Sequence, residues 1–202
     1  MGNKREPMKQ HAIEKKDIMI RKGFELICEE GYHRVSCADI AKYAGVSTGC
    51  VYQYFDDKHD ILLAGVRRYA DQIWFPIQNI WINAHDIQNH FDAILDDTVE
   101  EAIQVHTLSS KAHSELMSMS YVDPDIATIF RTKELEITDR IVEVLKKEGF
   151  SFDHLCERVH LMMNMIDNLC HEIIYHNHSS IDYQVMKKET VKMMRELFYG
   201  NK

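Results

Sequence analysis

Glycine and proline are scarce in this sequence, which contains only 8 glycines and 3 prolines among 202 residues. A β-rich fold needs many tight turns, and these two residues supply most of them, so their scarcity argues against a protein built on sheets. Long stretches of alternating polar and apolar residues are also missing. Because 45% of the residues are hydrophobic, the chain can still bury a sizeable core. We therefore expect an all-α protein.

Long apolar runs are missing as well, and none approaches the roughly 18 residues that a membrane-spanning helix requires. The N-terminus is polar and charged, unlike a secretory signal peptide. The five cysteines are odd in number and include no Cys-x-x-Cys pair, which fits reduced thiols better than a disulfide framework. These absences predict a cytoplasmic protein that has no contact with a membrane.

Common catalytic signatures are also absent. The sequence contains no Gly-rich phosphate-binding loop, no Gly-x-Ser-x-Gly elbow and no His-Glu-x-x-His helix. Its carboxylates are scattered over the surfaces of the predicted helices. We expect neither an enzyme nor a bound cofactor.

The formal net charge of −8 is distributed unevenly along the chain. Residues 1–62 are neutral overall, and the first 22 contain seven basic and three acidic residues, whereas the net negative charge falls after residue 62. Because the local field decides contact with a phosphate backbone, the N-terminal segment can bind nucleic acid while the acidic remainder repels it. An ordinary acidic protein with a basic tail would show the same distribution, so charge alone leaves both readings open.

Apolar spacing and capping signals predict about nine helices. Ser36 followed by Asp39 is typical of a helix start, and Gly45 of a helix end, while a proline after Asp123 indicates another start. Residues 1–10, which include Pro7, are expected to form a mobile arm, and Pro76 is expected to interrupt or kink the fourth helix. The expected helices cover about residues 12–30, 36–45, 47–55, 57–74, 86–107, 110–120, 123–147, 153–176 and 181–198.

The second and third predicted helices have the pattern of a helix-turn-helix. They are joined by Gly45-Val46-Ser47, where the glycine permits a tight angle and the valine anchors it in the core. In such a unit the second helix enters the major groove of DNA and the first crosses the backbone. Two packed helices of another kind could share this much of the pattern.

A longer pattern surrounds this unit. It runs through Phe24, Glu30-Gly31-Tyr32, residues 39–49 (DIAKYAGVSTG), residues 51–55 (VYQYF) and Lys58. In spacing and residue type this pattern resembles the TetR family of repressors over about residues 13–62; beyond residue 62 only length and helical character are similar. The resemblance implies a three-helix DNA-binding domain at residues 1–62 (about 11–62). It also implies a helical effector-binding and dimerisation domain at residues 63–202.

The resemblance also implies which residues contact double-stranded operator DNA. Residues 48–50 begin the recognition helix, where a hydroxyl can bond a base, a glycine permits close approach, and a thiol can contact a thymine methyl. Tyr52 and Tyr54 match an aromatic pair that meets phosphates, and Lys58 matches a phosphate clamp near a helix N-terminus. The expected DNA-binding residues are Ser36, Cys37, Ser47, Thr48, Gly49, Cys50, Tyr52, Gln53, Tyr54 and Lys58.

The last two predicted helices are expected to form a homodimer. Proteins with this DNA-binding unit bind palindromic sites as two-fold dimers, and the TetR family dimerises through these two helices. Their broad apolar faces suit a four-helix interface, although burial inside the monomer would give the same pattern. The expected interface residues are Leu161, Met165, Leu169, Met186, Met194 and Leu197.

Aromatic and methionine side chains are concentrated in the middle helices. The resemblance implies that a small molecule binds there and releases the DNA by favouring one conformation. A cavity with such a lining would suit a hydrophobic or aromatic effector, including a cationic one; the alternative is that these side chains only fill the core. The expected pocket residues are Trp74, Trp81, Phe91, Met117, Tyr121, Met162 and His171.

Twelve histidines raise the alternative of a metal-responsive regulator of the same fold. Asp167 and His171 stand four residues apart on one predicted helix, as do Cys156 and His160, which is a spacing that metal sites use. So many histidines produce such pairs by chance, and neither pair has a third ligand visible in the sequence, so we expect no metal site. A helical carrier or interaction protein without specific DNA binding is the other alternative, but it leaves the pattern of residues 36–58 unexplained.

Overall fold

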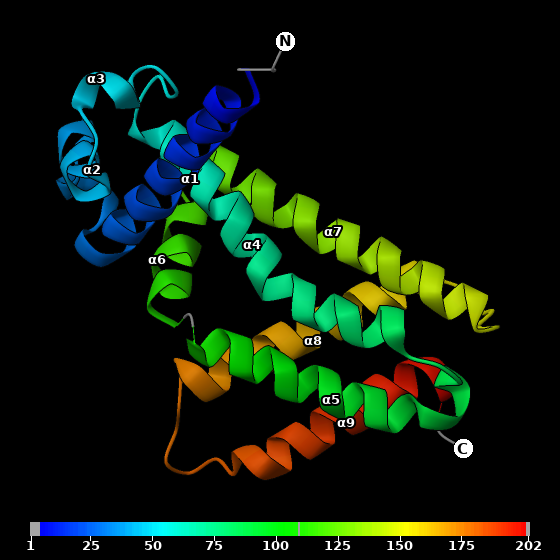
Figure 1. Ribbon diagram of the computed structural model, residues 1–202. Coiled ribbons are helices and arrows are strands. Elements are labelled where there is room, and N and C mark those ends of the chain that lie inside the picture. The colour runs from blue at the N-terminus through cyan, green and yellow to red at the C-terminus, as the bar shows by residue number, and fades with distance from the viewer. Residues whose placement is uncertain (1–4, 109, 201–202) are drawn as a thin grey trace. The chain divides into compact units, whose positions relative to one another are not determined.

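The computed structural model describes residues 5–108 and 110–200, with only the backbone described for residues 5–9. In these ranges every regular element is helical (Figure 1), so the expected all-α fold with about nine helices is confirmed. The elements are α1 (Arg5–Glu30), a 3₁₀ helix (Tyr32–Arg34), α2 (Cys37–Ala44), α3 (Thr48–Val51), α4 (Lys58–Asn83), α5 (Ile87–Leu108), α6 (Ser110–Ser120), α7 (Pro124–Lys147), α8 (Leu155–Ile174) and α9 (Tyr183–Tyr199).

The first helix begins earlier than the sequence predicts. The expected mobile arm is wrong from residue 5 onward, because α1 starts at Arg5; residues 1–4 of that arm lie outside the described residues. A proline at position 7 is compatible with this start. In the first turn of a helix it lacks only an N–H group that would have no partner within the helix.

Side-chain caps and a left-handed glycine define α2 as predicted. The Ser36 hydroxyl accepts a hydrogen bond from the Asp39 N–H at 3.2 Å, and the Asp39 carboxylate accepts one from the Ser36 N–H at 2.9 Å. At the other end Gly45 has a φ of +71°, a conformation that favours glycine. The Val46 N–H then bonds to the Ala41 carbonyl at 2.9 Å, which turns the chain toward α3.

Two helix lengths differ from the predicted ones. The recognition helix is shorter than predicted, because α3 covers only Thr48–Val51. Hydrogen-bonded turns continue from there to Phe55. The fourth helix runs through Pro76 to Asn83, so an interruption at that proline is wrong, whereas the expected alternative, a kink, stays a prediction. A proline removes one backbone hydrogen bond, and burial of Ile77 and Trp81 in the following turns favours continuation of the helix.

The described chain forms two compact units. The first comprises the residues up to Tyr69 together with Lys111–Ile129, and the second comprises Ala70–Ser110 and the residues from Phe130 onward. The divisions therefore fall inside α4, after the first residue of α6 and inside α7. Compared with the predicted ranges 1–62 and 63–202, the main difference is that the first unit includes α6.

The first unit is held together by apolar side chains on the inner faces of its helices. Ile27 of α1, Ile40 of α2 and Ile61 of α4 are completely buried, and Val51 of α3 is buried with them. Phe55 is also buried, whereas Phe24 and Val46 are half-buried. This packing fixes the angle between α2 and α3, on which a DNA-reading surface depends.

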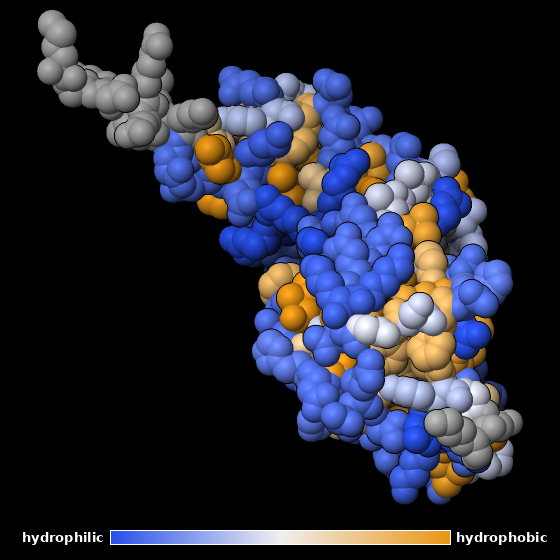
Figure 2. Space-filling view, turned by 90° about the vertical axis from the view of Figure 1, so that its right-hand side faces the viewer, coloured by the Kyte–Doolittle hydropathy of each residue, from blue (hydrophilic) through white to orange (hydrophobic). Residues whose placement is uncertain are grey.

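The second unit contains one large hydrophobic cluster to which α4, α5, α7, α8 and α9 contribute. In Figure 1, the green α5 runs beside the orange and red helices α8 and α9. Phe91 lies at the centre of an aromatic group, with ring centroids 6.0 Å from Trp81 and 5.0 Å from Phe198. On the face drawn in Figure 2, hydrophilic residues predominate and hydrophobic residues form separate patches. Among the described helices, none combines the length and apolarity needed to cross a membrane.

Candidate functional site

The predicted recognition residues lie together at the surface of the first unit. Thr48, Gly49 and Gln53 are exposed, and Cys50 is half-buried. Ser47 caps α3, because its hydroxyl accepts a hydrogen bond from the Cys50 N–H at 3.2 Å. The buried Val51 anchors this short helix from beneath. The turn therefore exposes the Thr48 side chain, the Gly49 backbone and the Gln53 amide to solvent, and the buried Val51 fixes its position.

Tyr52 is the exposed aromatic residue next to this segment. Its side chain is 59% exposed, and hydrogen bonding with the buried Cys37 thiol raises the pKa of the Tyr52 hydroxyl. The hydroxyl therefore stays protonated at neutral pH and can donate to an anion. Cys37 itself is buried beneath the surface. The other tyrosine of the predicted pair, Tyr54, is half-buried.

Lys58 occupies the N-terminus of α4. Its ammonium group donates hydrogen bonds to the carbonyls of Tyr32 at 2.7 Å and Val35 at 2.8 Å, and it lies 4.3 Å from the centre of the Tyr32 ring. These two carbonyls hold the positively charged ammonium group of Lys58 beside the start of α2. Because an ammonium has three donors, these two bonds leave capacity for one more acceptor.

Ser36 precedes α2 on the same side of the unit. Its hydroxyl donates to the Asp39 carboxylate at 2.5 Å, in addition to accepting from the Asp39 N–H. These hydrogen bonds from the Ser36 hydroxyl and N–H hold the pKa of Asp39 below its usual value. Ser36 is thus a helix cap in the free protein, and it remains exposed.

A charged cluster between α1 and α2 was not among the predicted site residues. The Tyr43 hydroxyl donates to the Glu25 carboxylate at 3.0 Å, and Lys22 donates to the same carboxylate at 3.0 Å. The Lys22 ammonium also lies 4.6 Å from the centre of the Tyr43 ring. The basic character of Lys22 is visible in the sequence, but its approach to a residue of another helix is not.

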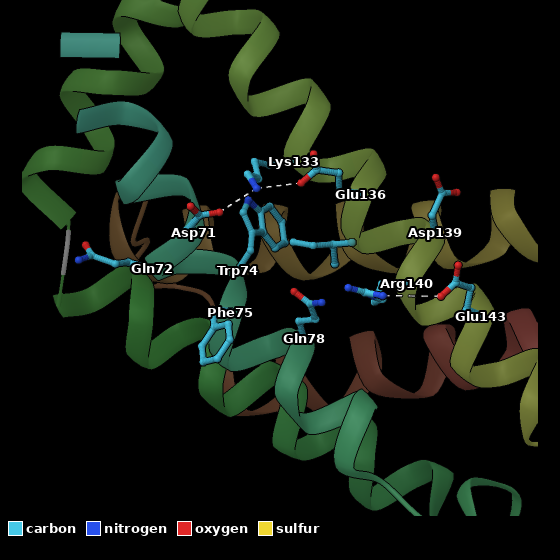
Figure 3. A pocket seen from close by; sticks show the side chains of 11 residues that line it. Asp71, Gln72, Trp74, Phe75, Gln78, Lys133, Glu136, Asp139, Arg140 and Glu143 are labelled. Carbon is cyan, nitrogen blue, oxygen red and sulfur yellow. Dashed lines mark hydrogen bonds and ion pairs between the residues drawn. The ribbon is translucent and has the colours of Figure 1, made fainter. Parts of the chain in front are cut away.

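A pocket of about 640 Å³ lies between α4 and α7 in the second unit (Figure 3). Trp74 and Phe75 supply its aromatic surface. Four carboxylates and two cations surround them, which leaves a formal excess of two negative charges in the lining. Lys133 is bound to Asp71 and Glu136, each at 2.8 Å, and the first of these hydrogen bonds contributes most to raising its pKa. The charged lining residues are Asp71, Lys133, Glu136, Asp139, Arg140 and Glu143.

The structure distributes the predicted pocket residues over several places. Trp74 lines the pocket just described, whereas Trp81, Phe91 and Met162 belong to the packed core of the second unit. In the first unit, Met117 is half-buried on α6 and Tyr121 is 89% exposed. His171 lies on α8, 3.8 Å from Asp167. The sequence analysis did not predict the α7 residues of this pocket, because charged residues on a helix are typical of a solvent-exposed face.

The predicted interface residues lie on α8 and α9 with different exposures. Leu161 is 48% exposed, while Met165, Leu169 and Met186 line a second cavity of about 330 Å³ together with polar residues. Met194 is buried and Leu197 half-buried. Two apolar residues outside the predicted set, Val185 and Met193, are 53% and 49% exposed. The outer faces of both helices therefore carry apolar side chains that the described chain leaves in contact with solvent.

Comparison with known proteins relates part of the first unit to a family. The model of the tetR family of bacterial regulatory proteins matches residues 20–64. The fatty acid metabolism regulator protein of Bacillus subtilis is 27% identical over 126 residues, which cover 60% of this chain and 56% of the relative. The regulator HbdR of Aromatoleum is 40% identical over 58 residues, covering 29% of this chain and 25% of the relative. The chain thus spans only about a quarter to a half of the length of these curated relatives.

Solved structures extend the likeness over the whole fold. A TetR-family transcriptional regulator of Mesorhizobium loti has a TM-score of 0.73 at 16% identity, covering 93% of this chain and 96% of that one. A transcriptional regulator of Saccharomonospora viridis in complex with choline has a TM-score of 0.64 at 18% identity, covering 90% and 96%. At such identities the likeness shows the shared fold. Residues 20–64 are therefore similar in sequence to the tetR family of bacterial regulatory proteins, and the described chain shares the all-helical fold of solved regulators of that family.

Proposed function

We propose that this protein is a ligand-responsive repressor that binds a palindromic operator as a homodimer and is released by a small organic cation. The exposed turn at Thr48, Gly49 and Gln53 carries the DNA-binding part of the proposal. A helix N-terminus with small, hydrogen-bonding side chains can reach base edges in the major groove. Burial of Val51 beneath it provides the rigidity that base reading requires.

Phosphate contacts on both sides of this turn would fix its register on the duplex. Tyr52 offers an exposed hydroxyl whose pKa is raised, so that it is protonated and can donate to a phosphate. Lys58 offers a positive charge whose position the Tyr32 and Val35 carbonyls determine. Such contacts contribute affinity for any DNA sequence, whereas contacts of the exposed α3 residues with bases determine which sequence is bound.

The outer faces of α8 and α9 support the homodimer. Leu161, Val185 and Met193 are each about half exposed, so a second copy would remove substantial apolar surface from water. Two-fold pairing through these helices forms a four-helix interface and duplicates the DNA-reading turn. The operator is then expected to be palindromic, with one half-site for each protomer.

The pocket between α4 and α7 supports a cationic effector. Trp74 and Phe75 provide ring faces, and the excess of carboxylates in the lining favours positive charge. Several carboxylates are engaged with Lys133 and Arg140, so a cation would compete with these side chains for them (Figure 3). The similar regulator crystallised with choline is a precedent for an organic cation in this fold.

The DNA-binding proposal can be tested with operator sequences selected from a random duplex library. We expect nanomolar binding at moderate salt and a loss of at least tenfold in Gln53→Ala, while Gln104→Ala, an exposed glutamine of α5, binds like the wild type. Lys58→Ala should weaken binding to all sequences and reduce the salt dependence by about one ion. Equal binding of selected and random duplexes would support the alternative of a helical ligand-binding protein without specific DNA recognition.

The effector class can be tested by thermal denaturation with choline and its uncharged tert-butyl analogue. A ligand that binds only the folded state raises the melting temperature by mass action, so choline should raise it and the neutral analogue should not. Trp74→Ala should remove the shift, whereas Tyr121→Ala, an exposed aromatic of the first unit, should retain it. An equal response to both compounds would show that charge is not recognised.

A further inference from the structure

Three metal-binding side chains meet where the end of α5 packs against α8. His106 lies in the last turn of α5, and Asp167 and His171 are one turn apart on α8. The Nε2 atom of His106 is 3.3 Å from Oδ1 of Asp167, and the Nε2 atom of His171 is 3.8 Å from Oδ2. Each residue has a ligand atom within 4.8 Å of those of the other two. One carboxylate therefore lies between two imidazole rings.

The backbone determines how His106 faces this carboxylate. Its Nδ1 atom lies 2.8 Å from the Ala102 carbonyl, which can only accept a hydrogen bond, so Nδ1 carries a proton. In a neutral ring Nε2 then presents a lone pair to the Asp167 carboxylate. Two acceptors at 3.3 Å repel one another unless a proton or a cation lies between them.

The arrangement suits a metal ion. Histidine ligands commonly donate the proton of their other nitrogen to a backbone carbonyl, as His106 does to Ala102. In tetrahedral zinc sites with bonds of about 2.0–2.1 Å, neighbouring ligand atoms lie about 3.4 Å apart, close to the 3.3 Å between His106 and Asp167. The side chains of Asp167 and His171 are 40% and 28% exposed, so an ion can enter from solvent.

We propose that His106, Asp167 and His171 bind a divalent transition-metal ion of the zinc type. Two imidazole nitrogens and one carboxylate oxygen form a donor set that zinc, cobalt and nickel share, whereas calcium and magnesium prefer oxygen ligands alone. The neighbouring Cys170 is not among the side chains whose ligand atoms converge at this site. The ion links α5 to α8, and its binding does not depend on the proposed binding of DNA.

Cobalt titration of the tag-free, chelator-treated full-length protein tests this site. We expect one Co²⁺ per chain, with the visible absorption bands of four-coordinate cobalt, and displacement of the band by one equivalent of Zn²⁺. His171→Ala and Asp167→Asn should each weaken binding at least tenfold with unchanged circular dichroism. Both side chains are partly exposed, so these changes are expected to leave the fold intact.

His90→Ala is the matched control. His90 also follows an aspartate by four residues and lies 3.8 Å from it, but both side chains of this pair are more than half exposed. The His90→Ala variant should bind cobalt like the wild type. The metal site is refuted if the wild type shows no stoichiometric band, if His90→Ala weakens binding as much as His171→Ala, or if both site variants bind normally. Stoichiometric cobalt binding by a protein that selects no operator would instead contradict only the proposed function.

Discussion

At residue 49, at the start of α3, an added Cβ atom would meet nothing within 4 Å in the free protein, and the backbone is not in the left-handed region. Gly49→Ala should therefore fold normally and can raise helix stability by up to about 1 kcal/mol. If this backbone lies against base edges, the methyl group would hold it away from the DNA. We expect unchanged or higher thermal stability with operator affinity reduced about tenfold, or about 1.4 kcal/mol. Fluorescence anisotropy and thermal denaturation measure the two effects, and unchanged affinity would remove Gly49 from the interface.

Asp123 makes the stability of the first unit depend on pH. Burial disfavours its charge, but the His59 side chain at 2.8 Å and the N–H groups of Asp125 and Ile126 outweigh this effect and lower its pKa. A lowered pKa in the folded state adds stability above the unfolded value near pH 3.8, and this contribution is lost as the pH falls through the folded pKa.

Comparison of Asp123→Asn with the wild type isolates this contribution. The variant should be less stable than the wild type near neutral pH, because asparagine carries no charge for His59 to stabilise, and the difference should shrink below about pH 4. Urea denaturation over a pH series measures it. Asp153→Asn, an exposed aspartate of the second unit, is the control. A difference that grows toward acid pH would contradict the assigned direction.

At the scale of elements, two glycines permit close packing of α1 and α4. A Cβ atom at Gly65 of α4 would lie 2.3–2.6 Å from Cβ, Cγ and Cδ2 of Phe24, close to the root of that side chain. At Gly23 of α1 it would lie 2.6 Å from the Ile61 side chain. Because the Cβ atom of Phe24 is fixed to its helix, the contact at Gly65 can be relieved only by moving a helix.

Gly65→Ala should therefore destabilise the protein by about 1–3 kcal/mol, despite the better helix propensity of alanine. Thermal or urea denaturation measures the loss. The same substitution at Gly49, which is in open space, should cause none. If the two variants are equally stable, α1 and α4 are not packed as closely as described.

The sequence predicts those elements whose signals are local. Ser36, Asp39 and Gly45 determine the ends of α2 within a few residues, and the structure has these ends where the pattern places them. The start of α1 and the passage of α4 through Pro76 were missed, because the cost of a proline depends on its helical turn and on packing beyond it. Sites formed between helices were also missed. His106 is 61 residues before Asp167, and no local spacing reveals their approach.

For the whole molecule, the charge distribution separates the proposed DNA-binding segment from the remainder of the chain. Residues 1–62 are neutral overall with a basic beginning, and the net charge of −8 falls in the remainder. A negative second part is repelled by the phosphate backbone, so the reading turns are the favoured point of contact. A single turn of this size contacts few bases, which is why specific binding is expected to require two copies.

Leu161 on α8 offers a test of this requirement. It is 48% exposed, and a charge placed there would lie within the proposed four-helix interface. We expect Leu161→Glu to be monomeric in analytical ultracentrifugation, with normal circular dichroism and operator affinity reduced about a hundredfold or more, because each half-site must then be bound separately. Leu135→Glu changes a leucine of α7 with a similar exposed fraction of 55%, and it should remain dimeric and bind normally. A Leu161→Glu protein that stays dimeric would move the interface away from this part of α8, and a monomer with full operator affinity would show that one reading turn is sufficient.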